Sequence, residues 1–265
     1  MQILEMTGTL TPNGTLTGEL TAGGGGGGGG TDNLPAVMFG TNTTPTINCP
    51  DAEHKSFKGL FALTEVTLPD ATAIEASAFA NFTALQKVTA PEVITVGQQA
   101  FYRCTGLTEV SLPKCVTVGS NIIDSTNLTA ISLPSVTVLP NDALQNARRC
   151  ATVNLPNCEI IGESALSSMA LTDIDLPKVR SIGKRAFDDN RSLQNVLFGY
   201  DGVVALPTLH DEWEEYNLFA WEVGSVNIFV PAGQLANYQA DSKWQKVVAE
   251  GTDHDYTVTF IGYHE

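Results

Sequence analysis

Basic residues are scarce in this 265-residue chain, because 14 Lys and Arg stand against 29 Asp and Glu, and the formal net charge is -15. Nucleic acid is therefore not expected as a partner, and an acidic membrane surface is disfavoured, since both need clustered cations. No apolar run reaches the length of about 18 residues that a membrane-spanning helix needs. The first basic residue is Lys55 and no apolar segment follows Met1, so no secretory signal is expected.

Cysteine and histidine are also sparse. There are five cysteines and four histidines, and no Cys-x-x-Cys pair occurs. An odd number of widely spaced cysteines is typical of buried, reduced thiols and not of a disulfide framework. The chain has no Gly-x-Ser-x-Gly motif, and its glycine tract is not followed by the Lys-Ser/Thr of a phosphate loop. No catalytic residue, cofactor site or metal site is predicted, and the chain is not expected to be an enzyme.

The most abundant feature is repetition. Residues 63–198 consist of similar units of 21 or 22 residues. The units begin at Leu63, Leu85, Leu107, Leu128, Cys150, Leu171 and Leu193. Self-similarity at a fixed period of this length is typical of a solenoid, in which one coil cannot bury its apolar face alone but a stack can.

Each unit carries the same apolar positions. The residues three and five after the start, such as Val110 and Leu112, alternate with the period of a short strand, and a proline follows in six units. A second apolar position comes five residues after the proline, with glycine behind it in four units. The pair Ala100-Phe101, or a substitute for it, stands 15 residues after each start. These positions are predicted to pack between coils, with the large residue filling the core from the opposite wall.

The pattern L-x-x-V-x-L-P-x-x-x-x-I-G-x-x-A-F resembles the BspA-like subfamily of leucine-rich repeats. The resemblance implies a mainly β solenoid, with short parallel strands on one wall and irregular or short helical segments on the other. Four places depart from the pattern, namely Ala90, Ile122-Ile123, Pro140 and Cys150. All are small or apolar, so they affect local packing and leave the fold prediction unchanged.

The sequence outside the repeats suggests further segments. Residues 1–22 alternate Thr and Leu around Pro12-Asn13-Gly14, which predicts a strand pair for anchoring or assembly, with a mobile terminus as the alternative. Residues 23–30 are eight glycines, predicted to be a linker, and 31–62 are predicted to approach and cap the repeats. Residues 199–265 are predicted to form an enlarged loop and a C-terminal α/β cap, which resembles the way such arrays end. The cap is expected to have one helix over residues 232–250 and a last strand over 256–264.

Two surfaces are candidates for binding. The first is the outward face of the predicted sheet, which is small and polar and suits either an ordinary solvated sheet or a weak glycan-binding face. Its candidate residues are Glu109, Asn154, Asp173 and Asp175. The second is the set of aromatic residues Trp213, Tyr216 and Trp221, which either contact a partner or pack in the cap. The neighbouring residues 210–215 are rich in acidic side chains but lack the spacing of a calcium loop, so a solvated loop is favoured over a metal site.

These features favour a non-enzymatic binding or attachment protein that presents a solenoid to a host or cell surface, with a protein or a glycan as its partner. The Thr- and Gly-rich N-terminus resembles tail-associated proteins of phages, which implies an extracellular or virion-associated location. Residues 1–22 would then serve attachment to a particle or formation of a homo-oligomer. A bacterial surface adhesin and a structural protein of a particle without a ligand remain open alternatives.

Overall fold

The computed structural model describes residues 64–68, 71–208, 215–219, 224–254 and 256–264, together with the backbone of three short strands near the N-terminus. Those strands are β1 (Leu4–Leu10), β2 (Leu16–Ala22) and β3 (Val37–Met38). β1 and β2 form the antiparallel pair that the Thr/Leu alternation predicts. β3 lies parallel to both β1 and β4, so this pair joins the sheet of its own chain. The glycine tract and most of residues 31–62 lie outside the described residues.

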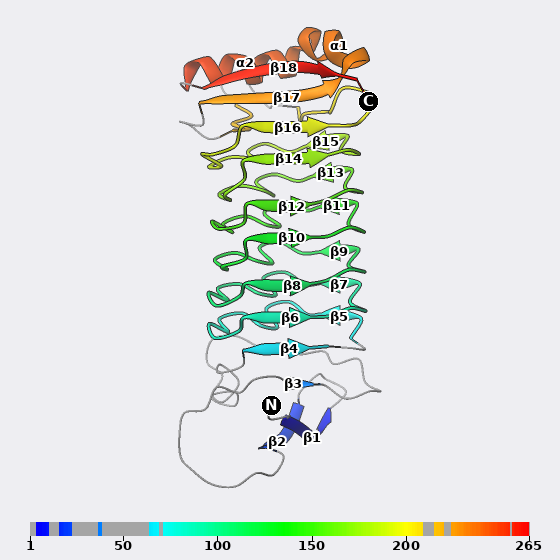
Figure 1. Cartoon of the computed structure of the whole chain (residues 1–265), viewed down its shortest axis with the longest axis vertical. Coiled ribbons are helices and arrows are strands. Elements are labelled where there is room, and N and C mark those ends of the chain that lie inside the picture. Colours follow the sequence, from blue (N-terminus) through cyan, green and yellow to red (C-terminus); the bar gives the residue numbers. More distant parts are fainter. Residues whose placement is uncertain are drawn as a thin grey trace.

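One wall of the repeats is a ladder of short parallel strands that follow one another along the long axis of the molecule (Figure 1). Each repeat supplies one strand. They are β4 (Glu65–Thr67), β6 (Lys87–Thr89), β8 (Glu109–Ser111), β10 (Ala130–Ser132), β12 (Thr152–Asn154), β14 (Asp173–Leu176) and β16 (Asn195–Phe198). Equivalent residues of successive repeats lie in register, as Glu65, Lys87 and Glu109 do. Residues at the same position of each repeat therefore form a row along the solenoid. The predicted solenoid is confirmed.

A second set of two-residue strands follows the prolines. It comprises β5 (Ala73–Ile74), β7 (Thr95–Val96), β9 (Thr117–Val118), β11 (Val138–Leu139), β13 (Ile160–Ile161) and β15 (Ser181–Ile182). Corner residues tie neighbouring coils together, as where the Gly119 N–H donates to the Val96 carbonyl at 2.8 Å. The remaining wall is built of turns, with two non-glycine residues of positive φ in each coil, such as Gln99 and Arg103 at 56° and 55°.

The interior between these walls is a continuous apolar core. Phe101 is fully buried, and its ring stacks on Phe79 with 5.7 Å between centroids and 8° between planes. The departures Ala90, Cys150 and the Ile122-Ile123 pair are fully buried as well. They therefore occupy the places of the usual residues in the core, as the repeat pattern predicts.

Four cysteines, namely Cys104, Cys115, Cys150 and Cys158, are buried as thiols. Burial raises the pKa of the last three thiols to about 11. A thiol modifier such as DTNB at pH 8 is expected to leave these cysteines unmodified in the native protein and to react with them in guanidinium, because the reactive thiolate is scarce and inaccessible. Fast modification of Cys115, Cys150 or Cys158 under native conditions would contradict this packing.

One core position, 19 residues after each start, carries a polar side chain in several coils. Thr126 donates to the Ile123 carbonyl at 2.8 Å, and Cys104 donates to the Phe79 carbonyl at 2.8 Å. Asn190 is fully buried and donates to the carbonyls of Leu166 at 2.7 Å and Phe187 at 2.9 Å. It therefore satisfies carbonyls of two consecutive coils at once.

Replacement of Asn190 with Ala is expected to lower the free energy of unfolding by about 2 kcal/mol, because two buried carbonyls would lose their donor. Urea denaturation followed by circular dichroism measures the effect. Asn157→Ala is the matched control, since its amide donates to the Pro134 carbonyl at 2.7 Å from a half-buried position. An equal cost for the two substitutions would argue against the special role of the buried amide.

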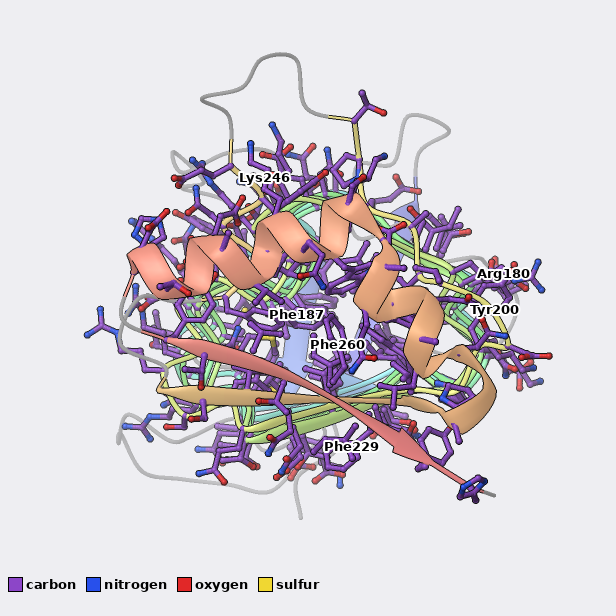
Figure 2. The ribbon with its side chains drawn as sticks, turned by 90° about the horizontal axis from the view of Figure 1, so that it is seen from above. Arg180, Phe187, Tyr200, Phe229, Lys246 and Phe260 are labelled. Carbon is purple, nitrogen blue, oxygen red and sulfur yellow. The ribbon has the colours of Figure 1, made fainter. Side chains whose placement is uncertain are left out.

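The C-terminal cap continues the sheet and closes the core. β17 (Ser225–Pro231) and β18 (Thr257–Tyr263) extend the ladder in parallel from β16. Between them lie a short 3-10 helix η3 (Ala232–Gln234), α1 (Leu235–Ala240) and α2 (Ser242–Asp253). Viewed along the axis, the helices lie toward the wall opposite β17 and β18 (Figure 2). The predicted cap and its last strand are confirmed.

The helical part of the cap differs from the prediction, because the single helix expected over 232–250 begins as the 3-10 helix η3, is interrupted at Asp241 and continues to Asp253. Asp241 has an extended backbone, and its carboxylate accepts from the N–H groups of Lys243 at 2.9 Å and Trp244 at 3.0 Å. It is therefore an N-cap, which starts α2 as a separate helix. The turn lets Tyr238 and Trp244 both enter the core, where their ring centroids are 5.7 Å apart.

The segment before β17 completes a last, irregular coil. Ala205 pairs in parallel with Ser181, and Phe219 pairs in parallel with Phe187. The Phe187 and Phe219 rings stack with 5.9 Å between centroids. The described parts of residues 199–225 thus pack on the preceding coil, and the enlarged loop expected there stays a prediction.

Candidate binding groove on the sheet face

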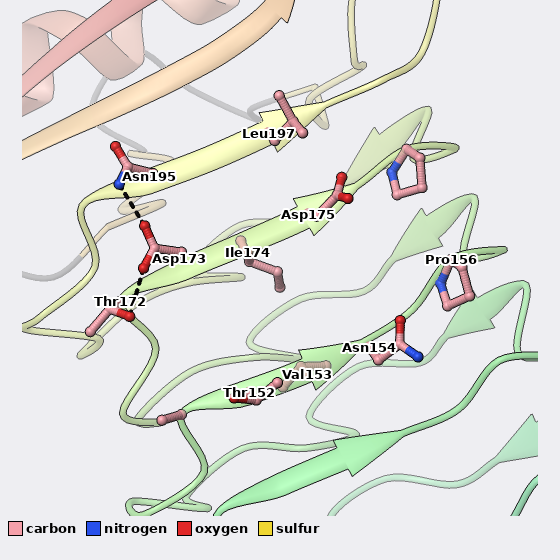
Figure 3. Close-up of a pocket in the computed structure, with 12 residues that line it drawn as sticks. Thr152, Val153, Asn154, Pro156, Thr172, Asp173, Ile174, Asp175, Asn195 and Leu197 are labelled. Atoms are coloured by element: carbon pink, nitrogen blue, oxygen red, sulfur yellow. Dashed lines mark hydrogen bonds between the residues drawn. The ribbon is translucent and has the colours of Figure 1, made fainter.

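Three of the residues predicted for binding come together in a groove on the outward face of β12, β14 and β16 (Figure 3). The groove has a volume of about 640 Å³, and Asn154, Asp173 and Asp175 line it together with Asn195 and Leu197. Their side chains point outward because the inward positions of these strands hold the core.

Asp173 is held in place by two neighbours. Its carboxylate accepts from Asn195 Nδ2 at 2.5 Å and from Thr172 Oγ1 at 2.8 Å. These hydrogen bonds, that of Asn195 first, lower the pKa of Asp173 below its ordinary value, so the carboxylate is charged at neutral pH. Asn195 in turn accepts from Asn227 Nδ2 at 3.0 Å. A hydrogen-bonded row therefore runs along the solenoid from β14 through β16 to β17.

The second outward row behaves differently. Asn154 Nδ2 donates to Ser132 Oγ at 2.9 Å, which fixes its amide on β12. Asp175, the next residue in this row, is exposed, and its side chain has no hydrogen bond or ion pair with any other residue that the structure describes. Its carboxylate is thus available to a ligand in the groove.

Glu109 lies on the same face but outside the groove. Its carboxylate pairs with Lys87 Nζ at 2.6 Å, and both side chains are largely exposed. An exposed ion pair of this kind contributes little to stability. The structure therefore does not bring Glu109 together with the other three residues on the sheet.

The structure places one residue of the second candidate surface, Tyr216, in the interior. Its side chain is 2% exposed, and its hydroxyl donates to the Pro207 carbonyl at 3.2 Å. It packs in the last coil, which is the alternative that the sequence left open, and it is not accessible to a partner. Trp213 and Trp221 lie outside the described residues, so their proposed role remains a prediction.

The acidic loop 210–215 also lies largely outside the described residues. Its last member, Glu215, contacts His254, with 3.2 Å between Oε2 and Nε2. The nearby Glu250 is buried and accepts from the N–H groups of Tyr216 at 2.8 Å and Asn217 at 3.1 Å. Among the described residues, no group of three His, Cys, Asp or Glu is placed to hold a metal ion.

Burial raises the pKa of Glu250 above its ordinary value of 4.5, although its two backbone donors act in the opposite direction. The protonated form is therefore favoured by folding, and this contribution to stability is present below about pH 4 and lost as the pH rises through the folded pKa. We expect the melting temperature of Glu250→Gln, relative to that of the wild type, to increase as the pH rises from about 4 to 7, because only the wild type then loses this contribution. Parallel pH profiles for the two proteins would contradict this role.

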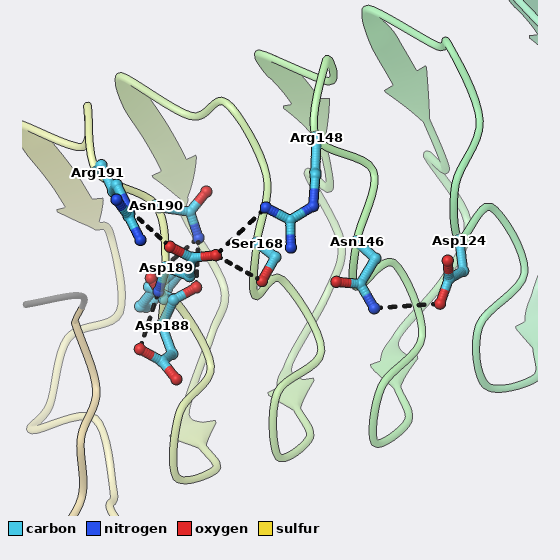
Figure 4. Close-up of polar contacts among 9 residues, drawn as sticks. Asp124, Asn146, Arg148, Ser168, Asp188, Asp189, Asn190 and Arg191 are labelled. Atoms are coloured by element: carbon cyan, nitrogen blue, oxygen red, sulfur yellow. Dashed lines mark hydrogen bonds and ion pairs between the residues drawn. The ribbon is translucent and has the colours of Figure 1, made fainter. Parts of the chain in front are cut away.

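On the wall opposite the strand ladder, a cluster of polar side chains forms contacts between neighbouring coils (Figure 4). Asp189 contacts Arg191 Nε at 2.8 Å, Arg148 at 3.7 Å and Ser168 Oγ at 3.1 Å. The Arg191 contact is the largest cause that lowers the pKa of Asp189. Asn146 donates to Asp124 in the same manner at 3.1 Å. These groups bind one another, so the cluster acts as a tie between coils.

Sequence reasoning missed two apolar residues, Phe229 and Ile261, at the end of the outward face near the cap. In register with Leu197 stand Phe229 on β17 and Ile261 on β18, and all three are half-buried and face away from the core. Figure 2 shows Phe229 on the side of the strands away from the cap helices, whereas Phe260 points toward those helices. The alternation in Val226–Pro231 was the available signal, because it places Phe229 opposite to the buried Ile228 and Val230.

The longest helix among the described residues, α2, has 12 residues, and none there is long and apolar enough to span a bilayer.

The sequence matches a family model described as the BspA type leucine-rich repeat region, in six copies over residues 46–146 and 117–201. Among solved structures, a leucine-rich cell surface protein from Faecalibacterium prausnitzii is similar, with a TM-score of 0.56 and 20% identity over 88% of this chain and 71% of that one. The T. pallidum leucine-rich repeat protein has a TM-score of 0.38 and 21% identity over 76% and 87% of the two chains. No curated protein matches.

Proposed function

Because the chain belongs to the BspA-type leucine-rich repeat family, we propose that it is a non-enzymatic binding protein that presents its solenoid at a surface outside the cell. The observation that carries the proposal is the groove of about 640 Å³ on the outward sheet face. Its outward polar side chains are not needed for packing, since the core is built from the inward positions, and the Asp175 side chain has no hydrogen-bond or ion-pair partner among the described residues. The description of the F. prausnitzii structure as a cell surface protein agrees with this location.

The partner is a protein or a glycan on a cell surface, and the N-terminal strands serve attachment. The Thr- and Gly-rich sequence that precedes the solenoid supports a particle such as a phage tail as the site of attachment. A bacterial surface adhesin is the alternative. Immunogold labelling distinguishes them, because labelled tails in preparations of induced particles support the first and label confined to the bacterial surface supports the second.

Binding of the fluorescent full-length chain to a panel of intact bacterial and host cells tests the proposed function. Saturable binding that unlabelled protein displaces is the expected result. Glu109→Gln serves as a control on the same face, because Glu109 lies outside the groove and binding should be unchanged. A chain that binds saturably to no cell in the panel would instead favour a scaffold protein without a ligand.

A further inference from the structure

The outward face near the cap carries two parallel rows of different chemistry. The first row, Asp173–Asn195–Asn227, is polar and joined by hydrogen bonds of 2.5 and 3.0 Å. The second row, Leu197–Phe229–Ile261, is apolar and crosses β16, β17 and β18 in register. Residues two apart on a strand are about 7 Å apart, so a ligand one ring wide can touch both rows.

The polar row is fixed before any ligand arrives. Each amide uses one N–H to hold its neighbour, which leaves a second N–H on Asn195 and Asn227 and lone pairs on Asp173 for an outside partner. Side chains held in this way lose little conformational entropy on binding. Such alternating acceptors and donors match hydroxyl groups, which donate and accept at the same atom.

The apolar row supplies the complementary surface. Phe229 is the aromatic member, and it is partly exposed between Leu197 and Ile261. The C–H face of a sugar ring is apolar and lies well on an aromatic or aliphatic side chain, whereas its hydroxyl edge points sideways toward polar groups. Strand spacing of about 4.8 Å repeats both rows at intervals comparable with one sugar unit.

The negative charge of the groove further restricts the chemical class of ligand that it can bind. Asp173 and Asp175 are both in the lining, and none of the groove residues is Lys or Arg. Phosphorylated, sulfated or uronic acid ligands are therefore repelled. A basic peptide is less suited than a neutral ligand, because the Asp173 carboxylate already accepts from two donors and only the Asp175 carboxylate in the lining has no hydrogen-bond partner among the described residues; a single exposed carboxylate binds a cation weakly.

We propose that the strip formed by the groove and the rows Asp173–Asn195–Asn227 and Leu197–Phe229–Ile261 binds a neutral oligosaccharide, whose chain runs along the solenoid axis. Asp175 accepts hydrogen bonds from its hydroxyls, and Phe229 supports one ring face. This inference rests on the proposed binding function and names the ligand class for it.

The test uses the full-length chain on an array of neutral oligosaccharides (chito-, manno-, gluco- and galacto-oligomers), with heparin and hyaluronan fragments as anionic probes and Lys/Arg-rich peptides as cationic probes. Neutral oligomers are expected to bind, with less than a twofold change in Kd between 50 and 500 mM NaCl. Phe229→Ala and Asp175→Asn are each expected to weaken binding about tenfold or more, and Glu109→Gln to leave it unchanged. Circular dichroism confirms that each variant is folded.

Several results would overturn the inference. These are binding by none of the neutral oligomers, binding that Phe229→Ala and Asp175→Asn leave intact, and binding of basic peptides alone that high salt abolishes. Cell binding measured with the same variants separates the two proposals. If the wild type and both variants bind cells equally, the protein is a binding protein but the saccharide strip is wrong. If the wild type binds neither cells nor the array, the proposed function fails as well.

Discussion

Replacement of Phe101 with Ala is expected to lower the free energy of unfolding by about 3–5 kcal/mol, the range for a large aromatic residue removed from a packed core. Phe101 is fully buried and stacks on Phe79 of the preceding coil. Its removal deletes apolar contacts within its own coil and between coils, and the backbone hydrogen bonds of this wall prevent the coils from closing the gap.

The loss is expected to be local along the solenoid, because each coil contacts only its neighbours. Hydrogen exchange in the native state should show reduced protection of the amides in β4, β6 and β8, while those in β17 and β18 stay protected. Urea denaturation gives the total cost. Tyr102→Ala is the matched control, since Tyr102 is half-exposed in the same turn and its ring meets the Arg103 guanidinium at 5.1 Å. Equal losses for the two variants would contradict the stacked core.

Replacement of Gly119 with Ala is expected to cost about 3 kcal/mol, because the added Cβ has no space at the corner between coils. An ideal Cβ there would lie 2.4 Å from the Gln98 backbone nitrogen and 2.7 Å from its Cα. The close approach is maintained by the hydrogen bond from the Gly119 N–H to the Val96 carbonyl. Pro140 takes this position in the following coil, where no N–H is available to form such a bond.

Thermal unfolding measures this cost, and Gly233→Ala is the control. Gly233 lies in η3, and an ideal Cβ there meets no atom within 4 Å. The control variant is therefore expected to melt within a few degrees of the wild type, while Gly119→Ala melts well below it. A Gly119→Ala protein that melts with its control would show that the corner can relax at little cost.

The repeat could be predicted closely from the sequence because its determinants are periodic. A column such as Val88, Val110 and Ile131 is read directly from the spacing, and each of its members occupies an inward position of the sheet. The departure Cys150 shows why a substitution at a repeat position leaves the predicted fold unchanged. A small apolar side chain fills the place of leucine without exposing the core.

The cap was harder to predict because its determinants are tertiary. The helical pattern over 232–250 continues through Asp241, and the break follows from capping by that side chain and from the fit of Trp244 into the core. Tyr216 stood in an acidic, aromatic stretch that reads equally well as surface or interior. Its burial depends on Glu250, 34 residues later in the chain, which accepts its backbone N–H.

The groove could be predicted only in part. Alternation identified Asn154, Asp173 and Asp175 as outward residues one by one. Whether they share a site with Glu109 depends on distance along the solenoid, and Glu109 on β8 is separated from β12 by another coil. Phe229 was missed because the segment before β17 is longer than a repeat, so its register with Leu197 does not follow from the repeat spacing.

The central claim is that periodic residues build the core and outward residues near the cap bind the ligand. The triple variant Asn154→Ser, Asp175→Ser and Phe229→Ser tests it most directly, with thermal unfolding and cell binding measured on the same sample. The claim predicts a melting temperature within a few degrees of the wild type and cell binding reduced at least tenfold. A folded triple variant that binds cells as tightly as the wild type would contradict it.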